Sequence, residues 1–342
     1  MLVVMKIDAS KFEIDAVKTK IASLGYSAHE IPGAERVAIG ITGNKGKLDK
    51  NLFMVMPGVI DAISVSKPYK LVSREVKPDN TEIRLGDEII GGKELSIIAG
   101  PCSVESREQI LEMAEMLSSV GIKFLRGGAY KPRTSPYAFQ GLKEEALTFL
   151  SEVRRKTGMK IVTEVKDVAT LPYVAEVADV LQIGARNMQN FSLLEAVGRL
   201  KHPVLLKRGI SSTIEEFLMA AEYIVNQGNY NVILCERGIR TFETATRFTL
   251  DLNAVPVVKH LSHLPIIVDP SHGIGLWDGV SSMSMASIAA GADGLIIEVH
   301  KNPEAALSDG YQSLKPEKFK VLINKLKQIA EVMDRSLSLT KN

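Results

Sequence analysis

The stretch LSIIAGPCSVESREQILEMAEMLSSVGIKFLRGG (residues 95–128) has a β-rich apolar run on either side of a helical segment at 106–120. The same alternation continues along the chain. Eight strand–helix units in about 250 residues are typical of a (β/α)8 TIM barrel. A doubly wound sheet is the alternative, but it usually has fewer strands, and no GxGxxG motif follows the first run. The runs are LSIIAG (95–100), KFLRGG (123–128), KIVTEV (160–165), VLQIGA (180–185), PVLLKRG (203–209), VILCERG (232–238), PIIVDP (265–270) and GLIIEVH (294–300).

Residues 1–66 predict a separate small α+β domain. The pattern is strand, helix, strand, strand, helix, strand, which is the order of a ferredoxin-like fold. Residues 67–94 then form a linker and a β-hairpin, with Gly91-Gly92 between its two strands, and the barrel covers 95–335. The six predicted segments of the small domain are 2–7, 12–24, 26–31, 35–41, 48–56 and 59–66.

The composition is that of a soluble globular enzyme or binding protein. Among 342 residues, 42 Lys and Arg balance 40 Asp and Glu, so neither nucleic acid nor an anionic membrane is expected as a partner. Two cysteines, Cys102 and Cys235, exclude a disulfide framework, and we interpret Cys235 as a buried apolar residue. No signal peptide or transmembrane run is found, so we expect a cytoplasmic protein.

Ionisable side chains follow the predicted strands, where a TIM barrel carries its active site. Most are cations, and arginine forks bind phosphate and carboxylate oxygens in pairs, so small phosphorylated ligands are expected. One thiolate, one imidazole and two carboxylates follow the first, seventh and eighth of the predicted barrel strands. These strands are neighbours in a closed barrel, so the four side chains can meet. Together they suit a first-row divalent metal ion. The cations are Arg126, Lys131, Arg133, Arg186, Lys207 and Arg237, and the candidate metal ligands are Cys102, His272, Glu298 and Asp309.

Seven motifs in chain order resemble 3-deoxy-D-arabino-heptulosonate 7-phosphate (DAHP) synthase, in the subgroup with an N-terminal ferredoxin-like domain. The resemblance covers residues 67–335 and extends to the domain at 1–66. The motifs are IAGPCSVES (98–106), LRGGAYKPRTSPYAFQG (125–141), IGARNMQNF (183–191), LLKRG (205–209), ILCERGIRTF (233–242), DPSHG (269–273) and EVH with ALSDG (298–310).

The resemblance implies that phosphoenolpyruvate condenses with erythrose 4-phosphate in the first step of the shikimate pathway toward chorismate and the aromatic amino acids. It implies a divalent metal cofactor, manganese foremost, with cobalt, iron and zinc as alternatives. It also implies that Cys102 and His272 act in catalysis as two of the four metal ligands. For this reaction, our hypothesis is that Lys131 donates a proton to the nascent alkoxide and that Glu164 lies beside the attacking water. The implied substrate-binding residues are Arg126, Lys131, Pro132, Arg133, Thr134, Ser135, Ala185, Arg186, Lys207, Arg237 and Asp269.

Three other functions fit part of the sequence. 3-Deoxy-D-manno-octulosonate 8-phosphate synthase shares the barrel and takes arabinose 5-phosphate, but that family has an Asn-Arg-Ser type sequence where this chain has Lys131-Pro132-Arg133-Thr134. A Schiff-base aldolase would use Lys207. A non-catalytic metabolite sensor would retain the barrel as a relic.

The small domain has two interpretations. The resemblance implies an allosteric unit at which an aromatic amino acid docks between neighbouring subunits of a homo-oligomer, a dimer or tetramer. His29 suits an effector contact, whereas Ile31 stands where a hydroxyl would help. The alternative is a packing and oligomerisation element.

Trp277 in the barrel replaces a cation that many relatives carry after DPSHG. We expect this change to alter loop packing or a subunit contact without loss of catalytic activity.

Overall fold

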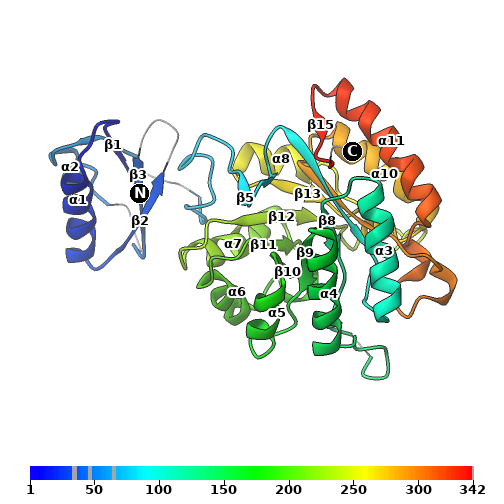
Figure 1. Cartoon of the computed structure of the whole chain (residues 1–342). Helices are drawn as coiled ribbons and strands as arrows, with labels where there is room; N and C mark the ends of the chain where they lie inside the picture. Colours follow the sequence, from blue (N-terminus) through cyan, green and yellow to red (C-terminus); the bar gives the residue numbers. More distant parts are fainter. Residues whose placement is uncertain (33–36, 45–47, 64–66, 134, 341–342) are drawn as a thin grey trace.

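The computed structural model describes residues 1–32, 37–44, 48–63, 67–133 and 135–340. Figure 1 shows a small N-terminal unit set to one side of a larger barrel, with residues 67–80 leading from one to the other. Among the described residues, no helix combines the length and the apolar character that crossing a membrane requires.

The N-terminal unit is a four-stranded antiparallel sheet with two helices. Its strands lie in the order β2-β3-β1-β4, which confirms the predicted ferredoxin-like fold. Ser10 and Glu13 form a capping box that begins α1, whereas no side chain caps α2, which is one turn long and shorter than predicted. Parts of the strands predicted at 35–41 and 59–66 lie outside the described residues. The elements are β1 (Leu2–Met5), α1 (Lys11–Ser23), β2 (Ser27–Pro32), β3 (Val37–Thr42), α2 (Asn51–Met54) and β4 (Val59–Ile63).

The linker joins this sheet to the barrel through Leu71. A Cβ at Gly40 in β3 would lie 2.8 Å from Leu71 Cδ2, so a larger residue there would displace the leucine side chain. The backbone N–H groups of residues 70, 71 and 72 donate to the Glu222 carboxylate of α7 (Ile214–Val225) at 3.0, 2.9 and 3.0 Å. One carboxylate thus fixes the segment that contacts the small sheet.

A hairpin of β5 (Ile83–Leu85) and β6 (Glu88–Ile90) covers the barrel at the N-terminal ends of its strands. Its turn lies at Gly86, where φ is +65°, so the predicted turn at Gly91-Gly92 was wrong. Gly91 instead permits a close approach, since a Cβ there would lie 2.6 Å from the Thr81 carbonyl oxygen. Three hairpin side chains pack against the barrel interior; they are Ile83, Leu85 and Ile90.

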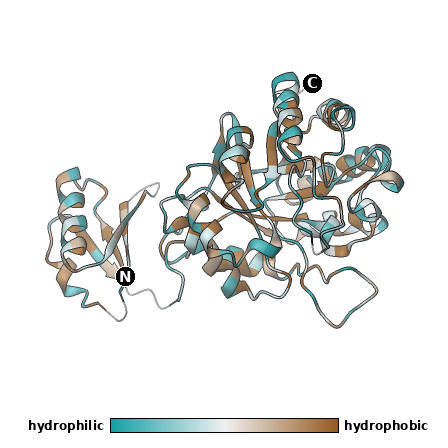
Figure 2. Cartoon of the chain, turned by 90° about the horizontal axis from the view of Figure 1, so that it is seen from below, coloured by the Kyte–Doolittle hydropathy of each residue, from teal (hydrophilic) through white to brown (hydrophobic). Residues whose placement is uncertain are grey.

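Eight parallel strands form the barrel, and β14 pairs with β7 to close it, which confirms the predicted TIM-type fold. Alternate residues face the interior or the helices, so each strand is apolar on both sides. Figure 2 shows hydrophobic residues along the strands and more hydrophilic ones on the helices. The strands are β7 (Glu94–Gly100), β8 (Phe124–Arg126), β9 (Lys160–Glu164), β10 (Val180–Ile183), β11 (Val204–Lys207), β12 (Val232–Glu236), β13 (Ile266–Val268) and β14 (Gly294–Glu298).

Helices surround the barrel, and a final short strand, β15 (Ser336–Leu337), pairs with the start of β7. Besides α7, they are α3 (Arg107–Ser119), α4 (Glu144–Thr157), α5 (Leu171–Val177), α6 (Phe191–Gly198), α8 (Ala254–Leu261), α9 (Pro270–Ile274), α10 (Trp277–Ala289) and α11 (Pro316–Val332), with 3-10 turns η1 (Ala185–Asn187), η2 (Pro303–Ala305) and η3 (Gly310–Gln312).

Candidate active site

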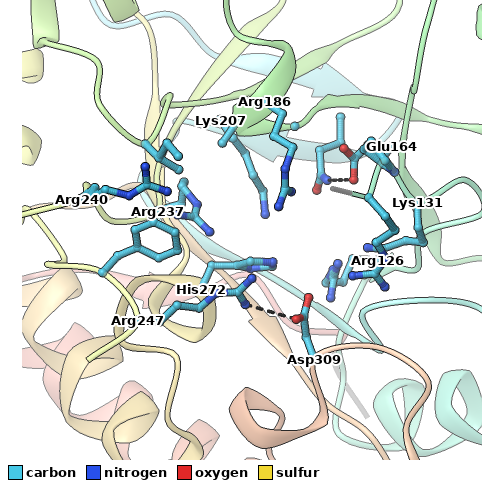
Figure 3. Close-up of a pocket in the computed structure, with 17 residues that line it drawn as sticks. Arg126, Lys131, Glu164, Arg186, Lys207, Arg237, Arg240, Arg247, His272 and Asp309 are labelled. Carbon is cyan, nitrogen blue, oxygen red and sulfur yellow. Dashed lines mark hydrogen bonds and ion pairs between the residues drawn. The ribbon is translucent and has the colours of Figure 1, made fainter. Parts of the chain in front are cut away.

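A cationic pocket lies at the C-terminal ends of the barrel strands (Figure 3). Arg126 and Lys207 are the last residues of β8 and β11, and Arg237 directly follows β12, so strand ends supply the deepest cations. Two carboxylates, Glu164 and Asp309, line the same pocket. Its cations are Arg126, Lys131, Arg133, Arg186, Lys207, Arg237, Arg240 and Arg247.

Two of the buried cations are neutralised by carboxylates. Arg126 Nη1 lies 2.8 Å from Glu298 Oε1, and Lys207 Nζ lies 2.5 Å from Asp269 Oδ2. Within the described part of the chain, no carboxylate pairs with the pocket arginines at 186, 237 and 240. Burial lowers the pKa of Arg237, which packs 4.1 Å from the centre of the Phe248 ring. This excess of positive charge favours a multiply anionic ligand.

Three of the four candidate metal ligands gather beside the pocket. Ligand atoms of Cys102, Glu298 and Asp309 all lie within 4.8 Å of one another, and the Cys102 thiol lies 3.2 Å from Asp309 Oδ2. The fourth, His272, is adjacent to this group, with Nε2 3.6 Å from Glu298 Oε1. Burial and the charge of Glu298 raise the pKa of Cys102 to about 11. A divalent cation would favour the thiolate here, so the donor set fits a metal with mixed N, O and S ligands.

Asp269 lies behind the pocket and does not line it. The carboxylate is 1% exposed and contacts both Lys207 and His272, whose Nδ1 is 2.7 Å from Asp269 Oδ2. The backbone N–H of His272 also donates to Asp269 Oδ1 at 2.9 Å. Asp269, which directly follows β13, therefore contacts two site residues and accepts a hydrogen bond from the backbone of one of them.

Lys131 and Glu164 both face the pocket. Lys131 Nζ donates to the Cys102 carbonyl oxygen at 3.0 Å and lies 3.2 Å from the Cys102 sulfur, which brings an ammonium beside the candidate metal ligands. Glu164 Oε2 accepts from Gln182 Nε2 at 3.4 Å. A Cβ at Gly184 would lie 2.1 Å from Glu164 Oε1, so this glycine leaves space for the carboxylate.

The loop after β8 contributes only part of its predicted binding residues. Pro132 and Arg133 line the pocket, and Arg133 donates to the Ser308 hydroxyl. Ser135 is exposed, does not line the pocket and accepts from the Tyr137 N–H. Thr134 lies outside the described residues. In the turn η1, Ala185 and Arg186 also line the pocket.

The loop after β12 supplies residues that sequence reasoning missed. Arg240, Arg247 and Phe248 all line the pocket, and Arg247 Nη1 lies 3.2 Å from Asp309 Oδ1 and 2.6 Å from Gln312 Oε1. The sequence signal that could have indicated them is the pair of arginines within GIRTFETATRF (238–248), directly after a predicted barrel strand. Trp277 lies outside the pocket at the start of α10, with Lys318 Nζ 3.6 Å from its ring centre.

Comparisons with known proteins agree with this arrangement. The DAHP synthetase I family model matches residues 73–335, and the DAHP synthase ferredoxin-like domain model matches residues 1–67. The chain belongs to the DAHP synthetase I family. The prediction of a 3-deoxy-7-phosphoheptulonate synthase is thereby confirmed.

Two kinds of relative illustrate the position of the chain in this family. Phospho-2-dehydro-3-deoxyheptonate aldolase of Thermotoga maritima is 54% identical over 333 residues, covering 97% of this chain and 98% of the relative. The crystal structure of the Thermotoga maritima enzyme matches with a TM-score of 0.79 at 52% identity, covering 98% of each chain. A 2-dehydro-3-deoxyphosphooctonate aldolase of Syntrophobacter fumaroxidans is 30% identical over 264 residues, covering 72% of this chain and 91% of the relative.

Proposed function

We propose that this family member condenses phosphoenolpyruvate with erythrose 4-phosphate to DAHP and inorganic phosphate, in a reaction that depends on a divalent metal. The observation that carries the proposal is the excess of pocket cations next to the candidate metal ligands Cys102, Glu298 and Asp309. Two phosphates and a carboxylate must be brought together in this reaction. Their mutual repulsion needs dense positive charge nearby.

Cys102, His272, Glu298 and Asp309 would hold the metal, which when bound supplies Lewis-acid polarisation of the aldehyde oxygen. The buried cations, Arg126 and Lys207 among them, grip the phosphate and carboxylate of phosphoenolpyruvate, while Arg133 serves the aldose phosphate. C3 of phosphoenolpyruvate attacks the aldehyde carbon, and water adds at C2 before phosphate leaves with C–O cleavage.

Proton transfer is assigned to two residues that face the pocket. Lys131 donates a proton to the alkoxide oxygen, since its ammonium lies within 3.2 Å of the Cys102 sulfur and so next to the aldehyde site. Glu164 orients the water that adds at C2. Lys207 acts as an anion ligand, and its 2.5 Å contact with Asp269 suits that role better than imine formation.

The deciding experiment offers phosphoenolpyruvate with either erythrose 4-phosphate or arabinose 5-phosphate to metal-loaded protein. We expect DAHP and stoichiometric phosphate with erythrose 4-phosphate only. Turnover with arabinose 5-phosphate but not with erythrose 4-phosphate would instead identify a 3-deoxy-D-manno-octulosonate 8-phosphate synthase. Absence of turnover with either aldose would favour the non-catalytic metabolite sensor. Borohydride trapping with substrate should give no stable adduct on Lys207.

We further propose that the small domain regulates the barrel. The domain division is 1–66, a linker and hairpin at 67–94, and a catalytic barrel at 95–335. His29 is half-buried, with Nε2 2.9 Å from Thr42 Oγ1, and that hydroxyl lies 3.3 Å from Asn226 Oδ1 at the end of α7. An effector that perturbs His29 would therefore act next to the barrel. We propose an aromatic amino acid as the effector. We also propose that the chain forms a homo-oligomer, and analytical ultracentrifugation would measure its oligomeric state.

A further inference from the structure

An ionic cluster joins Arg208 and Glu236, at the ends of β11 and β12, to Asp251 in the segment that precedes α8. Arg208 is 4% exposed and Glu236 is fully buried. Arg208 Nη1 lies 2.9 Å from Glu236 Oε2 and 2.8 Å from Asp251 Oδ2, and Arg208 Nε donates to the Ser212 carbonyl oxygen at 2.9 Å. No residue of this cluster lines the pocket. The established activity and the proposed mechanism leave its role open.

Strand alternation puts this cluster directly behind two pocket cations. Leu205 and Cys235 pack in the barrel interior, whereas Leu206 and Leu234 pack toward the helices. The next interior-facing positions are 207 and 237, whose cations line the pocket. The positions between them, 208 and 236, face the helix side, where their charges meet. The ion pair therefore ties together the two strand ends that carry Lys207 and Arg237.

Glu236 also fixes both ends of the loop after β12. Its Oε1 atom accepts from the backbone N–H of Gly238 at 2.6 Å and from that of Asp251 at 3.4 Å. The loop between them carries three pocket residues, Arg240, Arg247 and Phe248. It is held further by the Arg240 N–H, which donates to the Ile210 carbonyl oxygen at 2.6 Å. One carboxylate oxygen thus receives both ends of a loop that lines the pocket.

We propose that Arg208, Glu236 and Asp251 are positioning residues for substrate binding, which set the place of Arg237 and of the loop arginines at 240 and 247. The inference rests on the proposed function, because it takes the ligand of these arginines to be phosphoenolpyruvate. None of the three touches substrate. Their effect is on the geometry of the anion contacts, and a displaced arginine fork loses its paired hydrogen bonds to the bound anion, which weakens binding.

The test replaces Glu236 by Gln, which keeps the size and an acceptor oxygen for the loop N–H groups but removes the charge that Arg208 meets. Binding of phosphoenolpyruvate is measured by calorimetry, with kcat, both KM values and thermal unfolding. We expect Kd and KM for phosphoenolpyruvate to rise roughly tenfold, with a much smaller change in kcat. Asp251→Asn, in which Arg208 keeps Glu236, should shift Kd in the same direction by less.

Asp293→Asn is the matched control. Asp293 is a buried carboxylate near the opposite end of the barrel, where it lies 2.7 Å from Lys259 Nζ and accepts from the Ile266 N–H at 3.0 Å. The Asp293→Asn substitution should lower thermal stability and leave the Kd for phosphoenolpyruvate unchanged.

If Glu236→Gln and Asp293→Asn lower stability alike and neither changes Kd, the cluster is only structural and the proposal is overturned. If Glu236→Gln does not fold, an unchanged Kd in Asp251→Asn overturns it equally. The proposed function fails separately, because then the wild-type protein itself forms no DAHP from the two substrates.

Discussion

Replacing Lys131 by Met gives the sharpest test of the proposed chemistry. The side chain is 7% exposed, and its ammonium lies 3.0 Å from the Cys102 carbonyl oxygen and 3.2 Å from the sulfur. Methionine has a similar length and no proton to donate. Loss of a general acid costs roughly 10²–10⁴-fold in rate, so kcat should fall by that factor. At 1.36 kcal/mol per tenfold, the barrier rises by about 3–5 kcal/mol.

The assay is steady-state turnover at saturating substrates and metal, with metal content and thermal unfolding measured on the same samples. Lys123→Met serves as the control, because it likewise removes a lysine ammonium, here one that lies 2.8 Å from Glu88 Oε2 and outside the pocket. If Lys131→Met binds metal normally and keeps a kcat near that of wild type, Lys131 is not the proton donor.

The other predictions concern the metal, the linker and the small domain. Chelation should abolish turnover, manganese should restore it, and Cys102→Ala should lower metal affinity in a chelator-competition titration. Gly40→Val would drive a side chain into Leu71, so protease should cleave the 67–80 linker faster than in wild type. Burial lowers the pKa of His263 to about 4, below its unfolded value of about 6.5, so the free energy of unfolding should fall as pH drops between these values, and less so in His263→Gln. Tyrosine or phenylalanine should inhibit the full chain and not a form lacking residues 1–66; equal insensitivity in both would exclude the regulatory role.

The sequence was sufficient to predict the barrel and most of its deep cations. Each strand is a local apolar run, and Arg126, Lys207 and Arg237 lie at or next to strand ends, so topology alone brings them to one rim. Arg240 and Arg247 were missed because they enter the pocket only when the loop after β12 folds back, and that fold depends on contacts with distant residues. No period in the sequence reports such contacts.

Two further differences have local causes. The hairpin turn was assigned to Gly91-Gly92 because paired glycines usually mark turns, yet Gly86 takes the positive φ that the turn requires. Asp269 stands at a strand end like its neighbours, but it is the N-cap of α9 and accepts from the His272 N–H, which turns its carboxylate away from the pocket.

The hairpin of β5 and β6 separates stability from chemistry in this barrel. Ile83, Leu85 and Ile90 extend the apolar interior at the end of the strands remote from the pocket. A substitution there should weaken the folded state while the residues that line the pocket keep their places. The two ends of one barrel can therefore vary independently.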